Sequence, residues 1–313
     1  MLNNFMISLE AVLPMFILMA IGFGVKEKKL LSPSEIKRLN HMVFVVFFPA
    51  MMFHNLYGMD ISEAFRPRLI VFAVIAVFLI YIGSVIVTFA AEKKPRSRGA
   101  MIQGLYRSNF VIMGLPIAIN MFGQGNSGVT AMVVAIIVPL FNVLAVVTLE
   151  VFRGGRVEPV QIIRRIAANP LILGAAAGII TIIFEIRLPQ IIVSVADDMS
   201  SVATPLALVI LGASIDLSGI RNSSRNLLIV VIGRLVVIPA LGLTAAALAG
   251  FRGIEFVTLI AMLAAPTAVS SFTMAESMDS DGQLAGSIVV FTTAFASFTM
   301  FLWIFLFKNL GMF

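Results

Sequence analysis

The sequence predicts an all-α integral membrane protein in which ten transmembrane helices form two inverted repeats of five helices each. Three observations support this fold class. Hydrophobic residues make up 60% of the 313 residues and charged residues only 12%, and the mean hydropathy is +1.05. Soluble domains contain roughly 45–50% apolar residues, so only a membrane protein fits. Apolar stretches of spanning length recur along the chain, and its two halves repeat the same landmarks.

A membrane span needs about 20 mostly apolar residues. Ten stretches qualify: residues 8–25, 37–57, 68–91, 100–122, 128–152, 168–186, 198–217, 226–250, 254–276 and 285–307. The first lacks a basic leader and a small-residue cleavage site, so we expect a retained helix rather than a signal peptide. The second is preceded by Ser32 as the expected N-cap, with Pro33 in the first helical position and Glu35 in the third.

The basic residues test this count, because cytoplasmic loops of membrane proteins are enriched in lysine and arginine. With ten spans, alternate loops place 15 of the 22 basic residues on one side and 5 on the other. Counting Lys37, Arg38 and Arg68, at the first residues of their spans, with the adjoining loops, only Arg107 and Arg234 fall within spans. The bias supports ten helices with both termini outside.

Landmarks of the first half recur 156–158 residues later in the second half. The matched pairs are Pro49 with Pro205, Ser108 with Pro266, and Gly128 with Gly286. Because five is an odd number of helices, the second repeat (158–313) must enter the membrane upside down relative to the first (1–157). Inverted repeats are a hallmark of secondary transporters. The alternative is coincidence, since glycine and proline are common in membrane helices.

The fourth span contains residues that break a membrane helix. Ser108 and Asn109 compete with the backbone for hydrogen bonds. Gly114 weakens the following turn, and Pro116 removes a backbone donor. Unpaired backbone groups are not tolerated against lipid, so this segment is expected to line a cavity or to pack against protein. The alternative is a proline kink that only shapes helix packing.

The ninth span has a corresponding break at Pro266, followed by Thr267, Ser270 and Ser271. Two half-helices that cross near Asn109 and Pro266 would direct their positive N-terminal ends at one point, which favours a carboxylate. The predicted substrate-binding residues are Asn109, Ser108, Pro266, Thr267, Ser270, Ser271 and Asn142, and the predicted crossover or hinge residues are Gly114, Pro116 and Pro266. Arg107 and Arg234 are expected to snorkel to the surface or to pair locally.

Other classes of function receive little support. The chain has two histidines and no cysteine, and it lacks an HExxH motif, a P-loop and paired carboxylates within one span. We therefore expect no enzyme activity, no cofactor and no metal site. The net charge of +6 is accounted for by the loop asymmetry, so we expect a lipid bilayer and not a nucleic acid as partner.

Five segments together carry a resemblance to a known family. They are "LLSPSEIKRLNHMVFVVFFPAMMF", "RSNFVIMGLPIAINMFG", "VPLFNVLAVVTLEVF", "NPLILGAAAGI" and "LAAPTAVSSFTMAESM". In this order and spacing, over essentially the whole chain, the sequence resembles the auxin efflux carrier family, which includes carriers of malate and malonate. It departs from the plant pattern at Ser108, where the plant proteins have a proline before the asparagine.

The resemblance implies that helices one, two, six and seven form a scaffold, which often dimerises, and that helices three to five and eight to ten form a transport domain that slides as an elevator. It also implies that the substrate carboxylate meets Asn109 where helices four and nine cross. We therefore expect a secondary transporter of small organic anions. The alternatives are a sodium-coupled symporter like the bile-acid carriers and an anion sensor that does not transport. Coupling to Na⁺ or H⁺ stays open.

Overall fold

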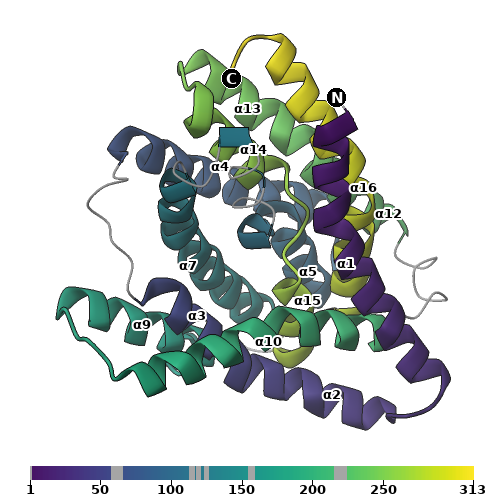
Figure 1. Cartoon of the computed structure of the whole chain (residues 1–313). Helices are drawn as coiled ribbons and strands as arrows, with labels where there is room; N and C mark the ends of the chain where they lie inside the picture. The colour runs from purple at the N-terminus through teal and green to yellow at the C-terminus, as the bar shows by residue number, and fades with distance from the viewer. Residues whose placement is uncertain are drawn as a thin grey trace.

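The computed structural model describes residues 2–57, 66–112, 117, 121–122, 127–153, 159–214 and 224–313, without the side chains of 2–12, 127 and 159. Within these ranges every named element is a helix, and the β-pairing there is an isolated bridge between Ser108 and Thr267. The described part of the protein is therefore all-helical, as the sequence predicts (Figure 1).

The helices described between residues 2 and 153 lie at the first five predicted spans. They are α1 (Leu2–Glu27), α2 (Pro33–Met42), the π-helical η1 (Val43–Phe47), α3 (Phe48–Leu56), α4 (Pro67–Ala91), α5 (Pro95–Tyr106) and α7 (Ser127–Phe152). The predicted start of α2 is confirmed. The Ser32 hydroxyl accepts a hydrogen bond from the backbone N–H of Glu35, whose carboxylate accepts one from the backbone N–H of Ser32 at 2.7 Å. This capping box satisfies two otherwise free donors.

Apart from α8 (Pro159–Ala167), which precedes the sixth predicted span, the helices described after residue 158 lie at the other five predicted spans. They are α9 (Pro170–Ile183), α10 (Gln190–Ser214), α12 (Ser224–Ile232), the π-helical η3 (Gly233–Val237), α13 (Ile238–Leu248), α14 (Gly253–Ala264), α15 (Ser270–Ser277) and α16 (Gly282–Asn309). The sixth predicted span, 168–186, is shorter than expected. Asn169 caps α9 and Pro170 occupies its first turn, so α8 is a separate helix.

Six helical segments in the described ranges are long and apolar enough to cross a membrane. They are Pro33–Leu56, Pro67–Ala91, Gly128–Phe152, Gln190–Ser214, Ser224–Leu248 and Gly282–Asn309. The pair formed by α8 and α9, bent by 59°, gives a seventh if it counts as one span. α14 is apolar but has only 12 residues, because it ends at a break. The protein is therefore a multi-pass membrane protein.

Two of these segments contain one turn of π-helix just before a proline, with one residue between them. η1 precedes Pro49 in this way, and η3 precedes Pro239. Proline lacks a backbone N–H, and its ring clashes with the carbonyl one turn earlier, so a wider turn relieves the clash without ending the helix. The bulge at η3 matters for the site, because it contains the buried side chain of Arg234.

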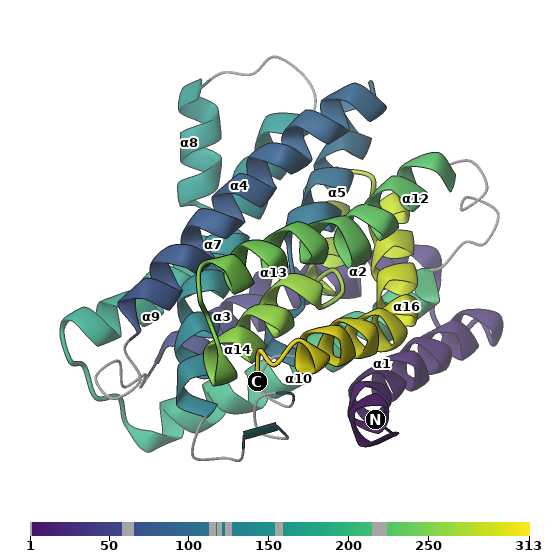
Figure 2. The same ribbon diagram turned by 90° about the horizontal axis from the view of Figure 1, so that it is seen from above.

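The helices form two groups. α1, α2, α3, α9 and α10 pack mainly with one another, and α4, α5, α7 and α12–α16 form the second group. In Figure 1, α2, α3, α9 and α10 lie along the lower edge, whereas α4, α13 and α14 lie above. Figure 2 shows α12, α13, α14 and α16 close together on one side of the second group. We call these the first and the second helix group.

Glycines bring helices of the first group into backbone contact. A Cβ atom at Gly22 would overlap the carbonyl oxygen of Val209, and one at Gly212 would overlap that of Met19. A Cβ atom at Gly174 would likewise overlap Pro49 in α3. Small residues permit such approach in membrane proteins, where close packing replaces the hydrophobic effect between helices. The first helix group is therefore a tightly packed unit.

This packing predicts that Gly212→Ala destabilises the protein. The added methyl group must push α1 away from α10, and overpacking of this kind costs about 1–3 kcal/mol of unfolding free energy. Thermal unfolding in detergent measures the effect. Gly83→Ala in α4 is the matched control, because a Cβ atom there meets nothing within 4 Å and alanine favours a helix. Equal melting temperatures for Gly212→Ala and the wild type would contradict the close approach.

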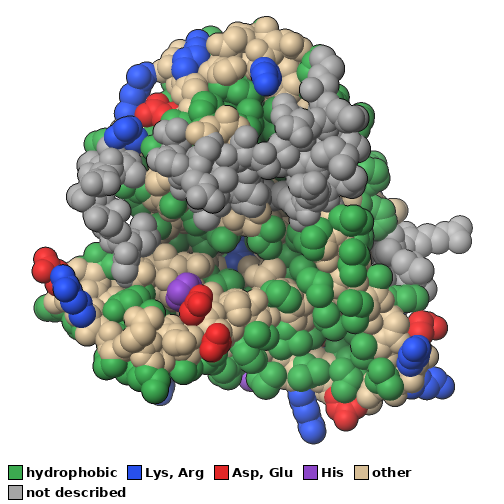
Figure 3. All heavy atoms as spheres, viewed as in Figure 1, with side chains coloured by type: hydrophobic (Ala, Val, Ile, Leu, Met, Phe, Trp, Pro, Cys, Tyr) green, Lys and Arg blue, Asp and Glu red, His purple; other side chains and the backbone are tan. Residues whose placement is uncertain are grey.

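The visible surface of the molecule is largely hydrophobic. Figure 3 shows green side chains over much of the face seen in Figure 1, with charged side chains mainly at its margins and one Lys or Arg in a central recess. α4 exposes Val71, Ile75, Leu79, Ile82 and Ile86 along its length. Apolar patches of this extent are expected where a helix faces lipid.

Candidate functional site

Both predicted breaks are present in the structure. α5 ends at Tyr106 and helix resumes at Phe110, while α14 ends at Ala264 and α15 begins at Ser270. Ala265 has ψ 153°, an extended conformation that the residue before a proline favours. Gly114 and Pro116, the other predicted hinge residues, lie outside the described residues. We call residues 107–109 and 265–269 the crossover.

The two extended segments of the crossover pair in antiparallel fashion. The backbone N–H of Asn109 donates to the carbonyl of Pro266 at 2.8 Å, and that of Ala268 donates to the carbonyl of Arg107 at 3.3 Å. Ser108 is paired with Thr267, one residue beyond the Pro266 that the repeat offset suggests. Backbone groups freed by the breaks thus satisfy one another, as they must in a membrane interior.

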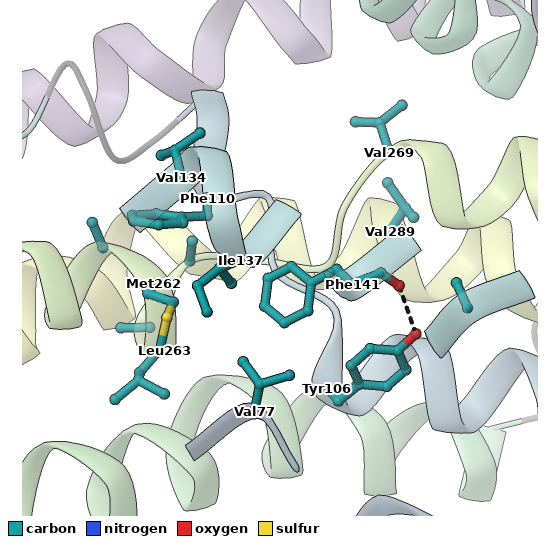
Figure 4. Close-up of a cluster of buried hydrophobic side chains, with 14 of the residues drawn as sticks. Val77, Tyr106, Phe110, Val134, Ile137, Phe141, Met262, Leu263, Val269 and Val289 are labelled. Carbon is teal, nitrogen blue, oxygen red and sulfur yellow. Dashed lines mark hydrogen bonds between the residues drawn. The ribbon is translucent and has the colours of Figure 1, made fainter. Parts of the chain in front are cut away.

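The crossover lies among buried apolar side chains. Figure 4 shows Phe110, which follows the first break, and Val269, the last residue of the second, in a cluster with side chains of α4, α7, α14 and α16. The hydroxyl of Tyr106 donates to the carbonyl of Phe141 in α7 at 3.0 Å. Apolar surroundings lower the local dielectric constant and strengthen electrostatic interactions at the site.

A cavity of about 60 Å³ lies between the crossover and the first helix group. Phe48, Met51 and Met52 of α3 and Leu171 of α9 form its apolar wall. Its polar wall comes from Arg107, Ser108, Asn109, Asn142, Thr204 and Ser270. The structure therefore brings four predicted residues together: Ser108, Asn109, Asn142 and Ser270.

Three other predicted residues do not line this cavity. Pro266 contributes its carbonyl to the bond with Asn109. Thr267 is fully buried, and its hydroxyl donates to the carbonyl of Gly104 at 2.7 Å while its backbone N–H donates to Thr292 at 3.2 Å. Ser271 is buried in the first turn of α15. The contacts of Pro266 and Thr267 hold the crossover together.

Two buried polar atoms at the cavity have no partner among the described residues. They are the Asn109 Nδ2 atom and the Ser108 Oγ atom. An unpaired buried donor or acceptor costs about 1–3 kcal/mol, so such atoms are rare outside functional sites. Asn109 Nδ2 is a donor, which suits a ligand oxygen.

Arg107 is the main departure from the sequence-based interpretation. Its side chain is 3% exposed, so it does not snorkel. The guanidinium donates to Gln103 Oε1 at 3.3 Å, to Met274 Sδ at 2.8 Å and to Asn142 Oδ1. No carboxylate in the described part of the chain pairs with it. Arg107 thus brings a full positive charge to the cavity wall.

Asn142 is held in position to meet this charge. Its Nδ2 donates to the carbonyl of Val138 at 2.9 Å and to Met52 Sδ at 2.8 Å, which turns its oxygen toward Arg107. The expectation that Asn142 faces the site is supported by this geometry. It also links α7 of the second helix group to α3 of the first.

The helix ends give the site a polarity. Ser270, the first residue of α15, lines the cavity, so the positive N-terminal end of α15 is near it. The C-terminal ends of α5 and α14 are bound instead by Arg234, which is 1% exposed. Its guanidinium donates to the carbonyls of Ala265, Met262 and Leu105. Snorkelling is therefore also wrong for Arg234.

No group of three or more His, Cys, Asp or Glu side chains that could hold a metal ion occurs in the described ranges. Sequence reasoning underrated the burial of two arginines, Arg107 and Arg234. The available signal was their position, because an ionisable residue inside a membrane span marks a functional site by default.

Comparison with known proteins agrees with this architecture. The sequence model of a family described as "membrane transport protein" matches residues 7–161 and again residues 157–304, which suggests two repeats. An uncharacterized transporter of Methanocaldococcus jannaschii is 24% identical over 305 residues, covering 95% of this chain and 98% of the relative. One of Methanothermobacter thermautotrophicus is 24% identical over 312 residues, covering 96% and 98%. The chain therefore belongs to the membrane transport protein family, that of the auxin efflux carriers, and is a transporter rather than an enzyme.

Proposed function

We propose that the protein is a secondary transporter of small organic anions and that it binds the carboxylate of its substrate at the crossover. The observation that carries this proposal is the buried guanidinium of Arg107 beside the unpartnered amide of Asn109. Both are donors at one small cavity, and the N-terminal end of α15 lies next to it.

The charge balance favours an anion over a neutral or cationic substrate. A buried arginine without a carboxylate partner is costly. A substrate carboxylate would supply the missing negative charge and could accept hydrogen bonds from Arg107 in a bidentate fashion. Neutral groups would leave the charge uncompensated, and a cation would be repelled by the arginine and by the N-terminal end of α15.

The size of the cavity favours short acids. Its volume of about 60 Å³ is well below the roughly 300–1,000 Å³ of ordinary small-molecule sites. An aromatic acid would require the wall formed by Phe48 and Met52 to move. We therefore propose mono- and dicarboxylates of short chain length as the substrate class.

The proposed mechanism is elevator-type alternating access. The ten spans would form two inverted repeats, over 1–157 and 158–313. Helices one, two, six and seven, which are α1, α2–α3, α9 and α10, would form the scaffold, and the second helix group would move. Asn40 of α2 donates to the carbonyl of Thr273 and to Ser277 Oγ, both at 3.1 Å, and Lys37 pairs with Glu276 at 3.4 Å. These contacts join the two groups and would have to open during transport.

The scaffold would also provide the surface for a homodimer. Isoleucines and valine on α9 and α10 are exposed: Ile179, Ile183, Ile191 and Val195. In this arrangement the protein lies in a prokaryotic cytoplasmic membrane with both termini outside. The basic loops then face the cytoplasm.

A thermal-shift screen across mono- and dicarboxylates tests the proposed function. We expect short carboxylates to raise the melting temperature and matched neutral amides to have no effect, because only the acids supply the negative charge. Uptake and counterflow of the best radiolabelled acid in proteoliposomes then separate a carrier from a sensor. Saturable binding without counterflow would contradict transport, and a screen without stabilising acids would contradict the substrate class.

A further inference from the structure

A second basic residue, Arg234, contacts the crossover on the side where α5 and α14 end. Its Nε atom donates to the carbonyl of Ala265 at 2.8 Å, its Nη2 atom to that of Met262 at 3.1 Å and its Nη1 atom to that of Leu105 at 3.3 Å. No carboxylate in the described ranges pairs with it. Figure 2 shows α12 and α13, which flank η3, beside α14, and η3 itself contacts α5 and α14.

The three carbonyls belong to the negative ends of two half-helices. A helix C-terminus carries about half a negative charge and several carbonyls without an intrahelical partner. Two such ends from α5 and α14 are held close together by the bridge between Ser108 and Thr267. Their mutual repulsion, and the carbonyls themselves, require a cation or strong donors in a site without water.

The guanidinium meets this requirement by geometry as well as by charge. It is planar, stays protonated and presents donors in a fixed fork. All three of its nitrogens are used, each by a different carbonyl. A point charge such as a lysine ammonium could not reach carbonyls of both half-helices in the same way.

Secondary transporters with broken helices bind their coupling sodium ion through unwound carbonyls and half-helix C-terminal ends. Resting on the function proposed above, we propose that the guanidinium of Arg234 is a built-in cation in this place, so that the protein neither binds nor requires Na⁺ at the crossover. The carbonyls of Leu105, Met262 and Ala265 each accept a hydrogen bond from the guanidinium, which takes the position beside them that an ion would need.

Sodium ions and guanidinium serve as probes, so the test needs no knowledge of the substrate. We expect the wild-type protein in detergent to melt at the same temperature in NaCl and in choline chloride of equal ionic strength. Arg234→Ala should melt about 5 °C or more lower, because several charge-assisted hydrogen bonds are lost. Millimolar guanidinium, or Na⁺ in place of choline, should recover part of the lost melting temperature, and only in the variant.

Arg252→Ala is the matched control. Arg252 is exposed and also donates to carbonyls, those of Ala247 and Phe251, so its loss should give neither the large shift nor the rescue. A sodium-specific rise in the wild type would overturn the proposal. An Arg234→Ala variant with the melting temperature of the wild type would also overturn it. The same holds if neither Na⁺ nor guanidinium raises the melting temperature of the variant, since the side chain would then only fill space. Because the readout is independent of carboxylates, failure here is distinguishable from failure of the proposed function.

Discussion

Arg107→Gln is expected to weaken binding of a carboxylate substrate by about 30-fold or more. Truncating one partner of a buried charged pair costs roughly 2–5 kcal/mol, and each 1.4 kcal/mol is tenfold in affinity. Glutamine keeps a polar side chain beside Gln103 and Asn142, so the loss of affinity would be due to the missing positive charge. Calorimetry or thermal-shift titration with the acid that stabilises the wild type most strongly measures the change.

The free energy of unfolding of a second variant shows whether Arg107 acts in substrate binding or in folding. Arg107→Met removes the charge but keeps the length of the side chain, and the free energy of unfolding should be unchanged or higher, because an unpaired buried charge is costly. Arg153→Gln is the control for the same chemical change. Arg153 lies at the end of α7 and pairs with Glu150 and Asp279 away from the cavity. Equal carboxylate affinities of Arg107→Gln and wild type would remove Arg107 from the site.

Asn109→Ala is expected to abolish carboxylate transport while the protein stays inserted and monodisperse. The backbone bond from Asn109 to Pro266 does not involve the side chain, and the Nδ2 atom has no partner among the described residues. The substitution therefore removes a donor to the substrate without breaking the crossover. A hydrogen bond to a charged group contributes about 1.5–3 kcal/mol, so affinity should fall by about 10- to 150-fold.

Two further variants sharpen this test. Asn109→Asp has the same shape but adds a negative charge, and it should bind the acid more weakly than Asn109→Ala because the two anions repel. Asn226→Ala is the control, since Asn226 lies at the start of α12 and donates to Glu92 rather than to the cavity. Uptake in proteoliposomes and size-exclusion chromatography give the two readouts. Wild-type affinity and turnover in Asn109→Ala would exclude a substrate contact.

The breaks themselves could be predicted from sequence because their causes are local. Pro266 has no backbone N–H, and serine and asparagine side chains such as those of Ser108 and Asn109 are able to compete with the backbone for hydrogen bonds, so each weakens its helix wherever the helix lies. The pairing of Ser108 with Thr267 could not be predicted to the residue. A repeat offset aligns whole helices, whereas the register of two extended segments depends on which carbonyls and N–H groups meet.

Snorkelling, one of the two alternatives expected for Arg107 and Arg234, was wrong for a physical reason. Insertion costs for a basic residue describe a side chain that faces lipid, and they lead to the expectation of snorkelling. The partners that make burial possible lie far away in sequence: Asn142 for Arg107, and Leu105 for Arg234. The helix α8 was missed as well, because the prediction began its sixth span at 168 and left 159–167 to the preceding loop, whereas Pro159–Ala167 is helical and bends by 59° into α9.

The bridge between Ser108 and Thr267 has a consequence for how the chain matures. Its two residues are separated by 159 positions, and chains are synthesised at about 5–20 residues per second. The first break therefore waits roughly 8–30 s in the membrane before its pairing segment has been made. During that time its backbone donors and acceptors need another partner, such as water or a membrane insertase. The site therefore closes only after the first break has been inserted into the membrane, when Thr267, in the last third of the chain, has been synthesised.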